Sequence, residues 1–238
     1  MENKAMNNIF KVTAMACLMS AAANAFAGPS TNLQVTGSVK MGACTVTLDN
    51  NIVDYGNFNV LQLPDQANQL PHKYLSMQIN CSTPTLLNWG TIDNRIGTSN
   101  RQAVLDAGIN GVSIMTANTN MFGMGKTKEG SNIGAYTFAF DYNNMTSDIG
   151  DAQLINLQTN LDGTGGEWLA AQSALAVSGV NAQTKYFALS NQADLIPIAF
   201  KNLTIPIKIA ASLGSINNTR ISEVTAIDGS ATILINYL

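Results

Sequence analysis

Charged side chains are scarce in this sequence. Asp, Glu, Lys and Arg make up only 11% of the 238 residues, against roughly a quarter in an ordinary globular protein. The 15 acidic residues outnumber the 12 basic ones, and the net charge of −3 leaves no basic stripe to neutralise nucleic-acid phosphates. Disordered chains are poor in apolar residues, but this chain is 46% hydrophobic. We therefore expect a folded protein with no nucleic-acid partner.

Histidine and cysteine are also few, which limits the chemistry available. The chain has one histidine and three cysteines, with no HExxH or CxxC spacing that would hold a metal ion. A serine nucleophile would need His72 as its base, and His72 lies between Pro71 and Lys73 in an expected loop. We predict no catalytic, metal or cofactor-binding residues, and hence no enzyme.

The first 27 residues have the features of a secretory signal peptide. Lys4 and Lys11 precede a largely apolar run, residues 12–23, which is too short to span a bilayer. Residues 25–27 (Ala-Phe-Ala) match the small-x-small pattern that a signal peptidase accepts. We predict cleavage between Ala27 and Gly28, with no membrane span in the mature chain, residues 28–238.

Signal cleavage also decides the cysteine count. It removes Cys17 and leaves Cys44 and Cys81. An even pair in an exported chain predicts one disulfide, formed in an oxidising compartment. The loop that this bond closes is long enough for a contribution of roughly 4 kcal/mol to stability.

Apolar and polar residues alternate along much of the mature chain, a period typical of strands with one buried face. The alternation occurs at residues 33–41, 74–81, 133–142, 152–161, 186–190, 203–213 and 231–238. Clusters of Asn, Asp and Gly separate these segments and indicate turns, and the chain holds 28 asparagines. Only residues 102–107 and 168–177 could be helical. The pattern predicts a single all-β domain, an antiparallel sandwich or barrel.

The C-terminal strand carries a further signal. Ile233, Ile235 and Tyr237 alternate up to the carboxylate of Leu238. If their apolar face were uncovered, the strand would be an open edge that invites another chain to add a strand. The alternative is a last strand paired inside its own sheet, and this segment alone does not decide between the two.

Four segments, in this order, resemble the pilin subunits of chaperone–usher fimbriae. They are residues 33–46, residues 53–56 (Val-Asp-Tyr-Gly), residues 79–81 (Ile-Asn-Cys) and residues 231–238 with their penultimate tyrosine. The middle of the chain is similar instead to the GltF-like group, fimbrial-related exported proteins of undefined function. The segments that carry this second resemblance are residues 93–97, 122–125, 133–136 and 167–168.

The resemblance implies an immunoglobulin-like, pilin-type antiparallel β-sandwich, either complete or lacking its last strand. In the second case a periplasmic chaperone would fill the groove beside the C-terminal strand. It would contact Ile233, Ile235 and Tyr237 and hold the carboxylate of Leu238. Further implied partners are an outer-membrane usher and other fimbrial subunits. The implied role is a non-enzymatic structural or adhesive subunit, located in the periplasm or in a fimbria on the cell surface.

Two departures from the pilin pattern keep a second hypothesis open. The chain is longer than an ordinary pilin, and only residues 28–32 precede its first expected strand, so it has no separate N-terminal donor arm. The alternative is a self-complete periplasmic binding module that does not polymerise. In that case the additional residues would supply the missing strand.

Overall fold

The computed structural model describes residues 34, 36, 42–59, 65–100, 102, 106, 120–158, 166–171, 185–191, 194–221 and 223–238. The elements, in chain order, are β1 (Cys44–Leu48), β2 (Asn68–Gln69), β3 (Lys73–Thr85), β4 (Leu87–Asp93), β5 (Phe122–Gly123), β6 (Gly134–Phe140), β7 (Thr146–Ser147), β8 (Ala152–Gln158), β9 (Trp168–Ala170), β10 (Lys185–Asn191), β11 (Phe200–Leu213), the short helix α2 (Ile216–Thr219) and β12 (Ala231–Tyr237).

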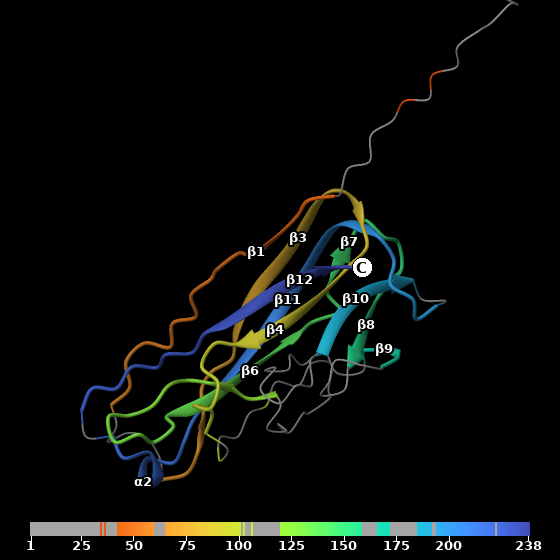
Figure 1. Ribbon diagram of the computed structural model, residues 1–238. Helices are drawn as coiled ribbons and strands as arrows, with labels where there is room; N and C mark the ends of the chain where they lie inside the picture. The colour runs from red at the N-terminus through yellow and green to blue at the C-terminus, as the bar shows by residue number, and fades with distance from the viewer. Residues whose placement is uncertain are drawn as a thin grey trace, which may run out of the picture. The chain divides into compact units, whose positions relative to one another are not determined.

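The strands form two antiparallel sheets (Figure 1). One has the order β1-β3-β11-β6-β5, with β2 and β7 also paired to β11, and the other has the order β12-β4-β10-β8-β9. Side chains from both sheets share one hydrophobic core, so the sheets pack face to face. The predicted all-β antiparallel sandwich is confirmed.

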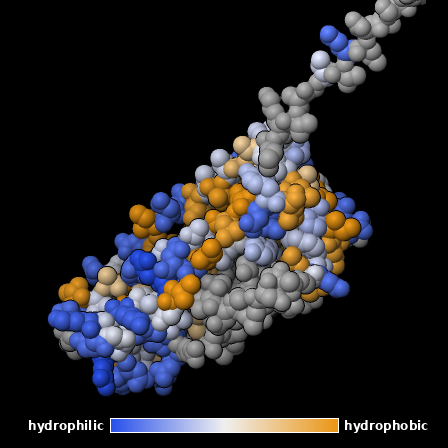
Figure 2. Space-filling model, viewed as in Figure 1, coloured by the Kyte–Doolittle hydropathy of each residue, from blue (hydrophilic) through white to orange (hydrophobic). Residues whose placement is uncertain are grey.

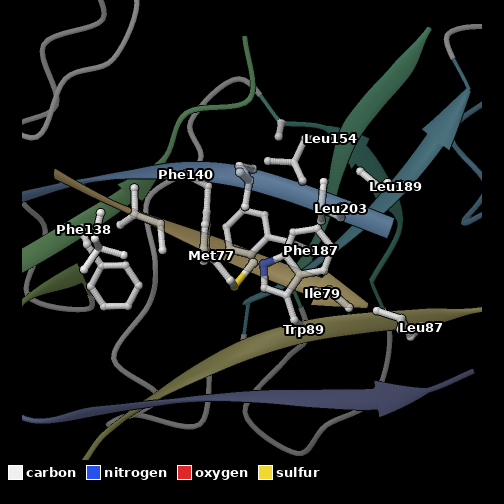
Figure 3. Close-up of a cluster of buried hydrophobic side chains, with 14 of the residues drawn as sticks. Met77, Ile79, Leu87, Trp89, Phe138, Phe140, Leu154, Phe187, Leu189 and Leu203 are labelled. Atoms are coloured by element: carbon white, nitrogen blue, oxygen red, sulfur yellow. The ribbon is translucent and has the colours of Figure 1, made fainter. Parts of the chain in front are cut away.

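The core is built on the alternation that the sequence displays. In β3, Leu75, Met77, Ile79 and Cys81 are all buried. From the facing sheet, Trp89 of β4 lies at the centre (Figure 3), with its ring centroid 6.1 Å from that of Phe187 on β10. Because aromatic rings bury large apolar areas, this cluster holds β4 between its neighbours β10 and β12.

β11 is an inner strand that contains a proline. Pro206 pairs with Ser76 of β3, but on the other side of β11 the pairing with β7 ends at Thr204 and that with β6 begins at Ile207. The missing N–H of Pro206 falls at this interruption, where it removes no ladder hydrogen bond. Its carbonyl still accepts a hydrogen bond from the backbone N–H of Asp141, at 2.7 Å.

Several local expectations were wrong or incomplete. Residues 168–170 form strand β9, so the helix considered for residues 168–177 is wrong at its start. Strand β4 was not predicted, and α2 lies in an expected turn. The predicted signal peptide and its cleavage site, between Ala27 and Gly28, lie outside the described residues. So does the expected strand at residues 33–41, apart from residues 34 and 36. Among the described residues, no helix has both the length and the apolar character to cross a membrane.

Candidate functional site: the open edges of beta1 and beta12

An apolar groove of about 420 Å³ lies between β1 and β12, the end strands of the two sheets. Its walls come from β1 and the segment that follows it and from the start of β12, and its floor comes from β3, β6 and β11. The lining residues include Val46, Leu48, Val53, Phe138, Ile207 and Ile233. In Figure 2, hydrophobic residues gather over the part of this face where β12 ends, whereas hydrophilic residues surround α2.

Backbone N–H and C=O groups of alternate residues of β12 point toward this groove. The N–H of Asn94 bonds to Ser230 and that of Leu238 bonds to Leu86. These two contacts define which residues of β12 bond to β4, because hydrogen-bonded and non-hydrogen-bonded pairs alternate in an antiparallel ladder. Hence the residues between them at odd positions turn their N–H and C=O groups away from β4, to the edge of β12 that is free among the described strands. They are Ala231, Ile233, Ile235 and Tyr237.

The edge of β1 has the same arrangement. The N–H of Ser82 bonds to the carbonyl of Ala43, and the N–H of Asp49 bonds to the carbonyl of Ser76. By the same alternation, the even-numbered residues of β1 direct their backbone groups away from β3. They are Cys44, Val46 and Leu48, whose side chains also pack against the core. Backbone groups of both edges therefore face the gap between the two strands.

The groove is uncharged. Its described lining residues include neither an acidic nor a basic side chain. Its polar groups include two tyrosines at the end away from the C-terminus. Burial raises the pKa of Tyr55 to about 12, and burial, with the charge of Asp93, also raises that of Tyr136. Both phenols therefore stay neutral at physiological pH. The groove suits an apolar, uncharged occupant.

The other end of the gap is crossed by a side chain. The backbone N–H of Cys44 donates a hydrogen bond to the hydroxyl oxygen of Tyr237, at 3.1 Å. Cys44 is itself held on β3 by its disulfide to Cys81, with the two Cα atoms 4.0 Å apart. The predicted disulfide is confirmed, and it fixes the β1 side of this contact.

The start of β12 is anchored by charged residues outside the groove. The guanidinium of Arg95 forms two hydrogen bonds of 2.8 Å to the carboxylate of Asp228, just before β12. The carboxylate of Asp93, at the end of β4, accepts hydrogen bonds from the backbone N–H groups of Arg95 and Gly123. These contacts place the chain before β12 beside the end of β4 and beside β5.

The four C-terminal residues predicted to bind a partner lie in different environments. Ile233 lines the groove, Ile235 packs on the core, and Tyr237 bridges to β1. Leu238 is 54% exposed, and its backbone N–H bonds to Leu86. Sequence reasoning missed the opposite wall, Val46 and Leu48, although both continue the alternation that starts at Cys44.

Among the described residues, the close contacts of His72 are a backbone carbonyl and a glutamine side chain. Its Nε2 lies 2.6 Å from the backbone carbonyl oxygen of Asp106 and 2.9 Å from Nε2 of Gln69. Neither contact is a serine hydroxyl or a carboxylate, the groups that a hydrolytic triad would need.

Comparison with known proteins gives relatives whose names state no activity. The profile of a family described as "Protein of unknown function (DUF1120)" matches residues 33–137. "Uncharacterized protein YhcF" of Escherichia coli (strain K12) is 28% identical over 242 residues, which cover 98% of this chain and 100% of that protein. "Protein GltF" of the same organism is 27% identical over 249 residues, which cover 97% of this chain and 98% of that protein. The expected similarity to GltF is confirmed, and the fimbrial role stays a prediction.

Proposed function

We propose that this protein is a non-enzymatic, fimbrial-like subunit that accepts an extended segment of a partner protein between β1 and β12. The observation that carries the proposal is a pair of strand edges that pair with no other described strand and that face one uncharged, apolar groove. In strand addition, main-chain hydrogen bonds supply affinity, and pockets for alternate side chains supply specificity. The groove offers both along the same two edges.

The partner proposed first is a periplasmic assembly chaperone, followed by an outer-membrane usher and other fimbrial subunits. The disulfide Cys44–Cys81 and the predicted signal peptide support export to an oxidising compartment. That compartment is the periplasm, or the cell surface once the subunit has joined a fimbria. The role in the fibre is structural or adhesive.

A self-complete periplasmic binding module is the second candidate function. It is favoured by the short stretch of five residues, 28–32, between the predicted cleavage site and the first expected strand. A subunit without a donor arm has no segment to pass to a neighbour. In this case the groove would take no partner strand, and the protein would act alone on an unidentified ligand.

Native mass spectrometry of the protein, drawn unreduced from a periplasmic extract of its own host, tests the proposal. We expect a 1:1 complex with a second chain of chaperone size. The subunit itself should have the mass of residues 28–238 less two hydrogens. Ile233→Glu should abolish the complex, because it places a charge in an apolar groove.

Thr232→Glu is the matched control, since Thr232 is exposed on the other face of the same strand and should leave the complex intact. Circular dichroism of both variants checks that each is folded. A wild-type protein recovered only as a lone, folded monomer of the mature mass would overturn the subunit proposal and support the self-complete module.

A further inference from the structure

The hydroxyl of Tyr237 occupies a position that an added strand would otherwise use. The N–H of Cys44 faces the free edge of β1, where it would bond to a strand lying in the gap. Instead it donates to Tyr237, at 3.1 Å. The Tyr237 side chain therefore crosses between the two edges near the C-terminus.

Both sides of this bridge are fixed to the sandwich. On the β1 side, Cys44 is joined to Cys81 by the disulfide, and the carbonyl of Ala43 accepts the N–H of Ser82 at 2.9 Å. On the β12 side, the residue after Tyr237 donates its N–H to the carbonyl of Leu86 at 3.1 Å. An incoming strand cannot open this end without breaking a contact to an anchored residue.

The groove itself ends before the bridge. On the β12 side the groove is lined by Ile227, Gly229 and Ser230 before the strand and by Ala231 and Ile233 within it, and on β1 its last lining residue toward the bridge is Val46. The stretch from Gly229 to Ile233 holds five residues, a length of roughly 17 Å at about 3.3 Å per residue. The opposite end, at Tyr55 and Gly229, has no such bridge among the described residues.

We propose that Tyr237 is a register stop, which limits the incoming strand to about five residues in the groove and sets where that strand must end or turn away. This inference rests on the proposed function. The partner that fits is an extended segment with uncharged, apolar side chains at alternate positions. Its backbone would bond to Val46 and Leu48 on one side and to Ala231 and Ile233 on the other.

Amide hydrogen exchange of the processed, disulfide-bonded protein, measured by NMR, tests the stop. The probe is a synthetic peptide with blocked ends and the sequence of residues 33–41, which alternates as required, together with its truncations down to five residues. In the free protein we expect Cys44 to exchange slowly. In Tyr237→Phe it should exchange about fivefold to tenfold faster, as the loss of one hydrogen bond of about 1 kcal/mol predicts. Tyr74→Phe, at an exposed tyrosine of β3, is the control and should leave Cys44 unchanged.

Peptide binding supplies the second readout. In the wild type, saturating peptide should slow exchange at Val46 and Leu48, and affinity should stop rising beyond about five residues. In Tyr237→Ala, affinity should rise by a further tenfold or more toward nine residues, with Cys44 now protected by the peptide. Equal exchange of Cys44 in the wild type and Tyr237→Phe, or the same length dependence in the wild type and Tyr237→Ala, would overturn the stop alone. If Cys44 responds to Tyr237→Phe but no peptide slows Val46 or Leu48 in any variant, the proposed function fails and the stop fails with it.

Discussion

At the scale of single residues, two aspartates near the start of β12 have opposite electrostatic environments. Asp93 is only 1% exposed, and burial raises its pKa despite the hydrogen bonds that it accepts from the N–H groups of Arg95 and Gly123. Asp228 is exposed, and its hydrogen bond with Arg95 lowers its pKa. Both carboxylates lie at the same corner of the sandwich. Folding favours the protonated form of Asp93 and the ionised form of Asp228.

This difference predicts opposite pH dependences for two variants. Asp93→Asn removes one of two accepted hydrogen bonds and should cost about 1–3 kcal/mol of unfolding free energy. Because the pKa of Asp93 is raised in the folded protein, the folded state binds this proton more tightly than the unfolded chain does. Its contribution is therefore largest below pH 3.8 and falls as the pH rises through the raised pKa. The cost of Asp93→Asn should shrink in the same direction.

Asp228→Asn is the matched control. Its cost should be present above pH 3.8 and should disappear as the pH falls through the lowered pKa of Asp228. Urea unfolding of both variants and the wild type between pH 3 and 7 measures these slopes. Parallel slopes for the two variants would contradict the assignment.

At the scale of elements, strand position determines what a residue can do. Pro206 is tolerated within β11 because its missing donor falls between the partners β7 and β6. Lys208, two residues later, faces the same side of the strand and pairs with Ala139 of β6. A proline should therefore be tolerated at position 206 but should destabilise the fold at position 208.

We expect Pro206→Ala to change the unfolding free energy by less than about 1 kcal/mol, mainly through the entropy of the unfolded chain. Lys208→Pro should cost about 3 kcal/mol or more, because it removes a donor from a paired position. Thermal and chemical unfolding of the two variants gives the comparison. A loss for Pro206→Ala as large as that for Lys208→Pro would show that Pro206 is not at an interruption of the ladder.

At the scale of the whole molecule, the disulfide joins an edge strand to an inner strand. Among the described strands β1 pairs with β3 alone, and Cys44 and Cys81 are directly opposite in that pairing, 37 residues apart in the chain. The bond closes the loop of chain between β1, which forms one wall of the groove, and β3, which lies inside the sheet. It therefore supports the β1 side of the groove as well as the fold.

The double variant Cys44→Ser/Cys81→Ser should lose about 2–4 kcal/mol of unfolding free energy. Urea unfolding followed by the fluorescence of buried Trp89 measures the loss. Wild-type protein reduced with excess thiol is the control and should match the double variant. An unchanged midpoint and slope for the double variant would mean that the bond does not constrain the unfolded chain.

Much of the fold follows from local alternation. The spacing of Leu75, Met77 and Ile79 places them on one face of a strand whatever its neighbours are, because successive side chains point to opposite faces. Strand β4 was missed because its buried face continues from Leu87 and Trp89 into the polar residues Thr91 and Asp93. On its other face the ring of Tyr186 explains the glycine, since a Cβ at Gly90 would lie 3.0 Å from it.

The sequence by itself therefore determined the all-β class, the cysteine pair and the buried faces of the long strands. It also indicated the last strand as the candidate partner-binding strand. Only the tertiary structure decided that β12 and β1, at opposite ends of the described chain, face each other across a groove, and that Tyr237 bonds to Cys44. The physical reason is that a period of two fixes the face on which a side chain lies, whereas strand order fixes which edges stay unpaired, and strand order depends on contacts between residues far apart in the chain.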